Sequence, residues 1–176
     1  MNRRRLLAGV GAAAVGGLAG CLGAVTDDSD GGDGDRSDYD GLTVDTLSVA
    51  GSPGDAVPVA PERVTLLDFF ATWCAPCKPQ MAELRAVDRQ FPDVHLLSIT
   101  NERDEDAVRS FWREYEGTWP VGVDPDLDVS SEYRAGSVPT MVVLDPAGEQ
   151  RWRHSGLAAA DSIAAELEAA GAARDA

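Results

Sequence analysis

The sequence of 176 residues has room for one domain of ordinary size once its unusual ends are set aside. It contains 30 acidic and 15 basic residues, a formal net charge of -15, and its single lysine is Lys78. Nucleic acid is excluded as a natural partner, because phosphate contacts need clustered cations. The acid-rich, lysine-poor composition resembles that of proteins from salt-loving archaea, although any soluble acidic protein would also satisfy it.

The first 21 residues have the parts of an export signal. Arg3, Arg4 and Arg5 precede an apolar run that is shorter than the ~20 residues of a membrane span. The paired arginines resemble a twin-arginine signal, and residues 18–21, Leu-Ala-Gly-Cys, resemble a lipobox. We therefore predict cleavage before Cys21, and a lipid on its thiol that anchors the chain at the extracytoplasmic face of the membrane. The alternative is a retained signal anchor in which Cys21 is an incidental small apolar residue.

Residues 22–41 are predicted to be a disordered tether. Seven Asp and four Gly occur among residues 26–41. Such a segment cannot bury enough apolar surface to offset its ordering entropy, and its charges repel one another. Asp and Gly together also suggest calcium, but the EF-hand order of ligands with its terminal Glu is missing.

From residue 42 the pattern is that of a globular domain, which we place at residues 42–174. Apolar runs and alternation predict strands, the first of them at a sheet edge, over residues 42–49, 64–70, 94–100, 141–144 and 150–154. Apolar residues at helical spacing predict helices over residues 76–91, 104–115, 127–133 and 158–170. This order of strands and helices predicts an α/β sandwich.

Two cysteines stand where a buried strand gives way to a helix. Cys74 opens the predicted helix, and Cys77 follows three residues later, on the same helical face with Cβ atoms about 5–6 Å apart. Helix N–H groups and the helix dipole favour a thiolate at the first position. We therefore predict that Cys74 is the nucleophile and Cys77 the resolving thiol. Lys78 either adds to the stabilisation of the thiolate or faces solvent.

A metal centre is not predicted. The sequence has no second C-x-x-C motif to complete a four-thiolate zinc site, and His95 and His154 lie far apart without ligand spacing. Cys21 lies outside the predicted domain. We expect neither a metal nor another cofactor.

The chain resembles the thioredoxin superfamily, and within it the TlpA/ResA-type membrane-anchored disulfide reductases, over about residues 42–172. The resemblance rests on residues 67–78, Leu-Asp-Phe-Phe-Ala-Thr-Trp-Cys-Ala-Pro-Cys-Lys, and on residues 137–140, Ser-Val-Pro-Thr. It implies a three-layer sandwich with a central mixed β-sheet flanked by helices. It also implies that Pro139 is cis and lies against the disulfide, although a trans turn before a strand is physically sensible there too.

The same resemblance implies which residues bind substrate. The backbone before Pro139, at Val138, would hold the substrate in an extended form. Trp73 and Pro76, in the turn that carries the cysteines, are the other substrate-binding candidates. Trp73 is expected to be a partly exposed platform beside the disulfide rather than a core residue, because it directly precedes the catalytic turn.

Three polar residues bear on proton transfer. Asp68 lies in an apolar strand six residues before Cys74, where burial would raise its pKa enough to accept the proton of Cys77; a solvated place at a sheet edge is the alternative. Thioredoxins carry Asp at this position, whereas TlpA/ResA-type proteins often do not. Gln80 stands where the TlpA/ResA pattern often has Glu, which indicates a different arrangement for proton transfer. Glu102, after the strand at residues 94–100, is a further candidate neighbour of the site.

These features predict a thiol-disulfide oxidoreductase that works on exported proteins through a mixed disulfide at Cys74. We expect a monomer that depends on an unidentified membrane or extracytoplasmic electron donor. The alternatives are a non-catalytic binding lipoprotein, which would not need the cysteine pair, and a copper chaperone that holds Cu(I) between the two thiols. Pro76 and Pro139 fit disulfide exchange better. The direction of electron flow stays open, because dithiols of this general kind span about -270 to -120 mV.

Overall fold

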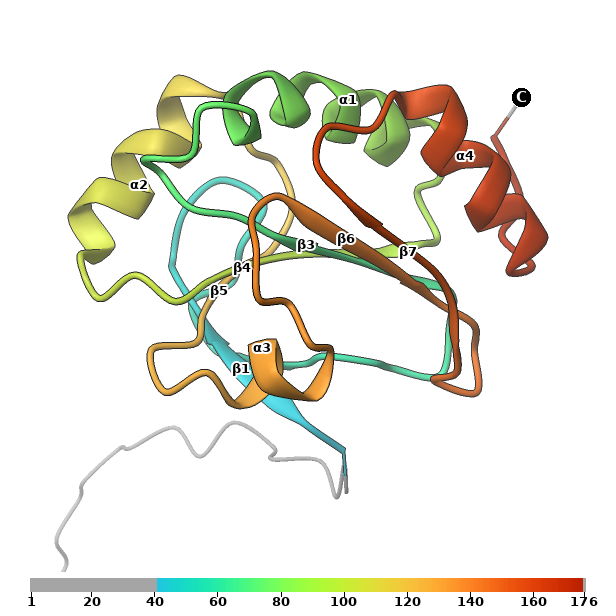
Figure 1. Ribbon diagram of the computed structural model, residues 1–176, viewed down its shortest axis with the longest axis horizontal. Helices are drawn as coiled ribbons and strands as arrows, with labels where there is room; N and C mark the ends of the chain where they lie inside the picture. The colour runs from blue at the N-terminus through green and yellow to red at the C-terminus, as the bar shows by residue number, and fades with distance from the viewer. Residues whose placement is uncertain (1–40, 176) are drawn as a thin grey trace, which may run out of the picture. The chain divides into compact units, whose positions relative to one another are not determined.

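A seven-stranded mixed sheet forms the middle layer of the domain (Figure 1). The computed structural model describes residues 41–175, so the predicted signal at 1–21 and nearly all of the predicted tether at 22–41 lie outside the described residues. The strand order is β2-β1-β5-β4-β3-β6-β7. The strands are β1 (Thr43–Thr46), β2 (Ala56–Pro58), β3 (Thr65–Phe69), β4 (His95–Thr100), β5 (Val121–Val123), β6 (Thr140–Leu144) and β7 (Gln150–Ser155).

Helices cover both faces of this sheet. They are α1 (Cys77–Gln90), α2 (Glu105–Glu114), α3 (Asp128–Glu132) and α4 (Ala160–Ala169). Figure 1 shows α1, α2 and α4 on one face and the short α3 on the other, and each face has its own apolar core. The predicted three-layer sandwich with a central mixed sheet is therefore confirmed. Within residues 41–175, no helix combines the length and apolar character that crossing a membrane requires.

Strand β3 lies inside the sheet and is buried along its whole length, as its apolar run predicts. Leu66 and Phe70 belong to the core under α1, α2 and α4, whereas Leu67 and Phe69 belong to the core on the α3 side. Because successive side chains of a strand point to opposite faces, Asp68 faces the same layer as Leu66 and Phe70.

The pairing of β3 with its neighbours gathers three loops at one edge of the sheet. Strand β3 runs parallel to β4 and antiparallel to β6, so that Phe69 pairs with Ile99 on one side and Thr140 on the other. The carboxyl ends of β3 and β4 and the beginning of β6 therefore meet. This places the loops at residues 70–77, 101–104 and 137–139 at the same end of the domain.

Local sequence explains where the two long helices on this face begin and end. Met81, Leu84 and Val87 give α1 a buried stripe, and the chain leaves the helix just before Pro92. Helix α2 begins after Asp104, whose carboxylate accepts a hydrogen bond of 3.1 Å from the amide of Ala107. Such a cap stabilises a helix by about 1 kcal/mol.

Strands β2 and β5 were not predicted, and the prediction that the first strand lies at the edge of the sheet was wrong. Strand β1 is not an edge strand, because β2 pairs with its outer side and β5 with its inner side. Both β2 and β5 have only three residues. A run of that length carries no readable period, and proline at Pro58 and Pro120 and a glycine at Gly122 argue locally against a strand.

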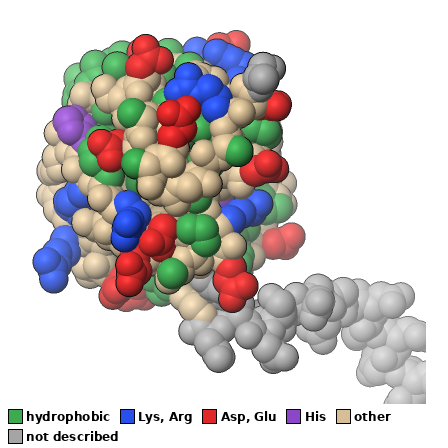
Figure 2. Space-filling view, turned by 90° about the vertical axis from the view of Figure 1, so that its right-hand side faces the viewer, with side chains coloured by type: hydrophobic (Ala, Val, Ile, Leu, Met, Phe, Trp, Pro, Cys, Tyr) green, Lys and Arg blue, Asp and Glu red, His purple; other side chains and the backbone are tan. Residues whose placement is uncertain are grey.

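Charge on the surface is mixed rather than segregated. On the face shown in Figure 2, acidic and basic side chains are interspersed. The ion pairs include Arg174 with Glu168 at 2.9 Å and, within α2, Arg109 with Glu105 at 3.1 Å. Exposed pairs of this kind contribute only about 0–1 kcal/mol each, so they moderate the repulsion of an acidic chain without holding the fold together.

Candidate functional site

Cys74 and Cys77 form a disulfide, with an S–S distance of 2.09 Å and 5.3 Å between their Cα atoms. The amide of Cys74 donates to the Ala71 carbonyl, and the amide of Cys77 donates to the Cys74 carbonyl. The turn that joins the strand to the helix therefore brings the sulfurs together through backbone hydrogen bonds of its own.

The beginning of α1 differs from the expectation. Cys77 is the first residue of the helix and Pro76 its N-cap, so Cys74 precedes the helix instead of opening it. Pro79 falls in the first turn, where a backbone amide has no partner within the helix, and proline costs no hydrogen bond there. Cys74 still lies off the N-terminus, where the first-turn amides and the helix dipole favour negative charge.

Exposure alone does not separate the two cysteines. Cys74 is 4% exposed and Cys77 is 2% exposed in the disulfide form. By contrast the neighbouring Trp73 is 73% exposed, as expected for a platform beside the disulfide. Pro76 and Lys78 are also exposed. A partner would therefore meet Trp73 before it reached either sulfur.

A cavity of about 170 Å³ opens next to the turn that carries Cys74. Trp73 and Val138 line it together, whereas Pro76 is not among its lining residues. It adjoins a second cavity, of about 350 Å³, that shares Leu127 and Gly136 with it. The two form a groove that begins at the disulfide turn and runs past the exposed side chain of Leu127.

The peptide bond between Val138 and Pro139 is cis, the form that the family resemblance implied. Pro139 is buried at the beginning of β6, and its carbonyl accepts a hydrogen bond of 2.8 Å from the amide of Gly156. Val138 is half-buried at the rim of the groove. The structure thus brings Trp73 and Val138 to one surface, and the buried Pro139 follows Val138 in the chain.

Glu102 holds the segment that leads into the cysteine turn. Its carboxylate accepts a hydrogen bond of 2.6 Å from the amide of Thr72 and one of 2.8 Å from the Thr72 hydroxyl. Thr100 donates a third, longer bond of 3.3 Å. Glu102 is therefore a neighbour of the site, as the sequence suggested, and its contacts serve the backbone just before Trp73.

Gln80 is buried and joins α1 to the segment before α4. Its side-chain amide donates to the Ala158 carbonyl at 3.1 Å and accepts from the Ala158 amide at 2.8 Å. Both ends of the side chain are satisfied by one backbone residue. These contacts give Gln80 a structural task, and a carboxylate in its place would lack the donor for the Ala158 carbonyl.

Asp68 is 1% exposed, which rules out a solvated place at a sheet edge. Ser98, beside it on β4, donates a hydrogen bond of 2.8 Å to Asp68 Oδ2. Within residues 41–175, Oδ1 is a buried side-chain oxygen that has no hydrogen-bond partner. Burial raises the pKa of Asp68 to about 7, against the opposing effect of the Ser98 hydrogen bond.

The hydrogen bond to Ser98 belongs to a longer series that the sequence did not reveal. The indole Nε1 of Trp119 donates to Ser98 Oγ at 2.9 Å, and both residues are buried. Trp119 packs edge to face on Trp112, with ring centroids 5.3 Å apart. Only the pairing of β3 with β4 could have pointed to Ser98, because 30 residues separate it from Asp68.

The two histidines lie apart: His154 pairs with Met141 near the beginning of β6 and contacts the Leu157 carbonyl, at 3.3 Å. His95 lies at the other end of β4, where its Nε2 is 3.0 Å from the Pro58 carbonyl oxygen. Burial lowers the pKa of His95 to about 4, so the ring is neutral and donates to that carbonyl. No cluster of three potential metal ligands occurs among residues 41–175.

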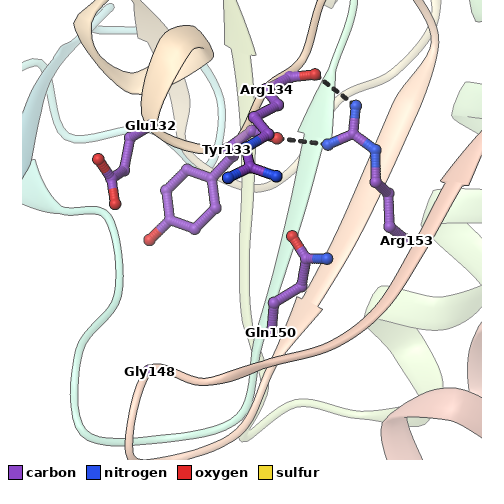
Figure 3. A pocket seen from close by; sticks show the side chains of 6 residues that line it. All are labelled: Glu132, Tyr133, Arg134, Gly148, Gln150 and Arg153. Carbon is purple, nitrogen blue, oxygen red and sulfur yellow. Dashed lines mark hydrogen bonds between the residues drawn. The ribbon is translucent and has the colours of Figure 1, made fainter.

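A wider cavity of about 540 Å³ lies between the end of α3 and the β6–β7 hairpin (Figure 3). In Figure 3 the Arg153 guanidinium donates to the carbonyl oxygens of Tyr133 and Arg134, so it holds the chain that leaves α3. Gly148 marks the hairpin, at the end of β6 remote from Pro139. Neither Trp73 nor Val138 lines this cavity, and we place the redox site at the narrower groove beside the disulfide turn.

Comparison with known proteins agrees with this placement. A family model described as Thioredoxin-like matches residues 62–150. The thiol-disulfide oxidoreductase ResA of Oceanobacillus iheyensis is 33% identical over 86 residues, which cover 48% of this chain and 45% of that protein. The chain spans about half the length of the curated relatives it matches.

Solved structures show the same fold. Mycobacterium tuberculosis DsbF, solved in mixed oxidised and reduced forms, gives a TM-score of 0.65 at 20% identity and covers 73% of this chain and 94% of its own. The exposed lipoprotein thioredoxin Etrx1 of Streptococcus pneumoniae strain TIGR4 gives 0.61 at 20% identity, over 73% and 98% of the two chains. At these identities the likeness concerns the fold.

Proposed function

Since this chain belongs to the thioredoxin-like family, we propose that it is a thiol-disulfide oxidoreductase whose Cys74–Cys77 pair exchanges disulfides with exported proteins. One observation carries the proposal. The disulfide lies at the edge of the sheet where Trp73 and Val138 line a single groove. An extended client segment in that groove would bring its own sulfur to Cys74.

The exchange runs in two steps. The Cys74 thiolate attacks one sulfur of a client disulfide, and the other client sulfur leaves as a thiolate. Cys77 then loses its proton and attacks Cys74 Sγ. The Cys74–Cys77 bond forms, the bond to the client breaks, and its electron pair leaves with the client sulfur. The client is reduced by two electrons and the cysteine pair is oxidised by two; the reverse sequence oxidises a client dithiol.

Asp68 is proposed as the group that accepts the Cys77 proton. Its side chain faces the layer that holds Cys77, and its pKa of about 7 lets it bind or release a proton near neutral pH. Gln80 stands in the place of a frequent glutamate of the TlpA/ResA pattern and cannot titrate. Asp68 on β3 would therefore take the part that a glutamate at the position of Gln80 on α1 would otherwise play.

The turnover test uses the full chain carrying Cys21→Ser, so that Cys74 and Cys77 are its remaining cysteines. With a chemical reductant and a disulfide-bonded model protein, we expect catalytic release of client thiols, and none from the same chain with both cysteines replaced by alanine. Equal thiol release from the two proteins would refute the proposal. Stoichiometric Cu(I) binding by a chain that does not exchange disulfides would favour the copper chaperone instead.

We also propose that the chain is exported and held at the outer face of the membrane by a lipid on Cys21. The support is the signal-like start of the sequence and the likeness of the fold to an exposed lipoprotein thioredoxin. Cys21→Ser should block processing or release the protein to the medium, measured by its mass and by membrane fractionation. A variant of unchanged mass that stays in the membrane would identify a retained anchor.

A further inference from the structure

We propose that Ser98 and Trp119 are positioning residues that keep Asp68 Oδ2 occupied and Oδ1 open, so that Oδ1 receives the Cys77 proton. This inference rests on the proposed function, since it concerns the proton transfer within the exchange. The hydrogen bonds of both side chains lead to Asp68 rather than to a cysteine. Each acts through the carboxyl that it orients.

The direction of the hydrogen bonds follows from the chemistry of the donors. An indole Nε1–H can only donate, so the bond from Trp119 occupies a lone pair of the Ser98 hydroxyl. The hydroxyl proton is then directed to Asp68 Oδ2. Trp119 is in turn fixed by its edge-to-face contact with Trp112, whose own Nε1 donates to the Ala50 carbonyl. The donor series thus runs from Trp119 through Ser98 to the carboxyl, and the bond from Trp112 to Ala50 anchors the ring that supports Trp119.

Oδ1 is left as the oxygen that can take a proton. It is buried and has no partner among the described residues, whereas Oδ2 already accepts the Ser98 proton. A buried carboxyl oxygen without a partner is costly, by about 1–3 kcal/mol. An open acceptor of this kind is what a transient proton carrier needs, because a permanent hydrogen bond there would compete with the transfer.

The surroundings of Asp68 contain few other groups that titrate. The core cluster on this face includes Cys74 and Cys77, and among the described residues the other buried side chains that can carry a charge, besides Asp68, are His95 and Asp124, of which Asp124 bonds to Ser130 of α3. On β4, His95 lies three residues from Ser98 and faces Pro58. Tyr115 packs at the margin of the cluster, against Phe111. The thiols are thus the titratable groups that share the interior of this layer with Asp68.

The test measures the protonation of Asp68 directly, by NMR of its labelled carboxyl carbon in the oxidised full chain carrying Cys21→Ser. Ser98→Ala removes a hydrogen bond that favours the carboxylate, so the titration midpoint should rise from about 7 by about one pH unit. Trp119→Phe keeps an aromatic ring but loses the donor, and should shift the midpoint in the same direction by less. Ser98→Thr keeps the hydroxyl and should restore the midpoint.

The matched control is Ser52→Ala, which removes another buried hydroxyl, one that accepts from the Val121 amide and does not contact Asp68. It should leave the midpoint unchanged. A midpoint unaffected by both Ser98→Ala and Trp119→Phe would overturn the proposal.

The rates of disulfide exchange are then measured for the same variants. At pH 7 a rise of one unit lowers the carboxylate fraction, and with it the rate of Ser98→Ala, about fivefold. In the Asp68→Asn background Ser98→Ala should cause no further change in the pH-rate profile. If the midpoint moves but the profile of exchange does not, Ser98 serves the fold alone and the proposal fails. A parent without exchange activity would refute the proposed function, while the NMR midpoints would still test the positioning.

Discussion

Replacing Cys77 by serine is expected to trap the protein on its clients. The variant keeps the proposed nucleophile Cys74 but lacks the thiol that would break the mixed disulfide, so covalent complexes should accumulate. They should appear as bands of higher mass that vanish on reduction. Cys74→Ser should form none and should lose at least about 10³-fold in client reduction, because a serine hydroxyl at this position is not a useful nucleophile toward sulfur.

This experiment decides which cysteine is the attacking thiol and which is the resolving thiol. The two residues differ in exposure by only two percentage points, 4% against 2%, so accessibility alone does not select the attacking sulfur. Their places differ more, since Cys74 precedes α1 and Cys77 is within it. If Cys74→Ser traps clients and Cys77→Ser does not, the roles are reversed. Full turnover by either single variant would end the dithiol mechanism.

Asp68→Asn is expected to slow exchange while stabilising the protein at higher pH. General-base assistance contributes typically about 10²–10⁴-fold, so a loss of about 10²-fold in the resolving step at pH 7 is expected. The parent rate should rise as pH increases through the Asp68 pKa of about 7. The variant should lack that inflection. Superimposable pH-rate profiles in high salt would show that the proton leaves Cys77 by another route.

The effect on stability has a defined sign. Asp68 has a pKa of about 7 when folded and about 3.8 when unfolded, so the folded state binds more protons between these values. Stability should therefore fall as pH rises from about 4 to about 7, by at most about 4 kcal/mol. Asn does not titrate, and its advantage over Asp should grow by that amount across this range.

Urea unfolding of the oxidised proteins at pH 4, 6 and 8 measures this difference. Any cost of burying the Asn amide without partners for its N–H groups does not change with pH, so it leaves the trend intact. Asp93→Asn makes the same substitution at an exposed position and should show no comparable trend. A constant difference between Asp68→Asn and the parent would mean that the carboxyl keeps one charge state throughout.

Much of the fold was predictable because its long elements have clear periods. The strands around Leu66 and Leu97 contain short apolar runs and are buried throughout, and α1 repeats its buried residues at helical spacing. The short strands β2 and β5 were not predicted, because three residues define no period. Pairing with strands that are distant in the sequence holds them in place. Their positions depend on tertiary contacts rather than on local preference.

The cysteines and the buried carboxyl of the site could be predicted from the sequence, whereas the residues that orient this carboxyl could not. Cys74 and Cys77 carry a motif with chemical meaning, and a charge in an apolar strand makes Asp68 conspicuous. Ser98 and Trp119 do not stand out in the same way, because a serine in a strand and an apolar aromatic residue have many ordinary uses. Their connection arises only when β3, β4 and β5 lie side by side.

The amide of Gln80 has a consequence for how the two outer helices behave during turnover. Its donor and acceptor are both neutral, so the link between α1 and Ala158 does not change with pH or with uptake of a proton nearby. A glutamate at this position would hold Ala158 fully only while protonated. In this chain the link from Gln80 to Ala158 is therefore independent of the protonation that accompanies exchange, whereas the second link between these helices, from the Ala160 amide to the Glu83 carboxylate at 2.7 Å, depends on a group that can titrate.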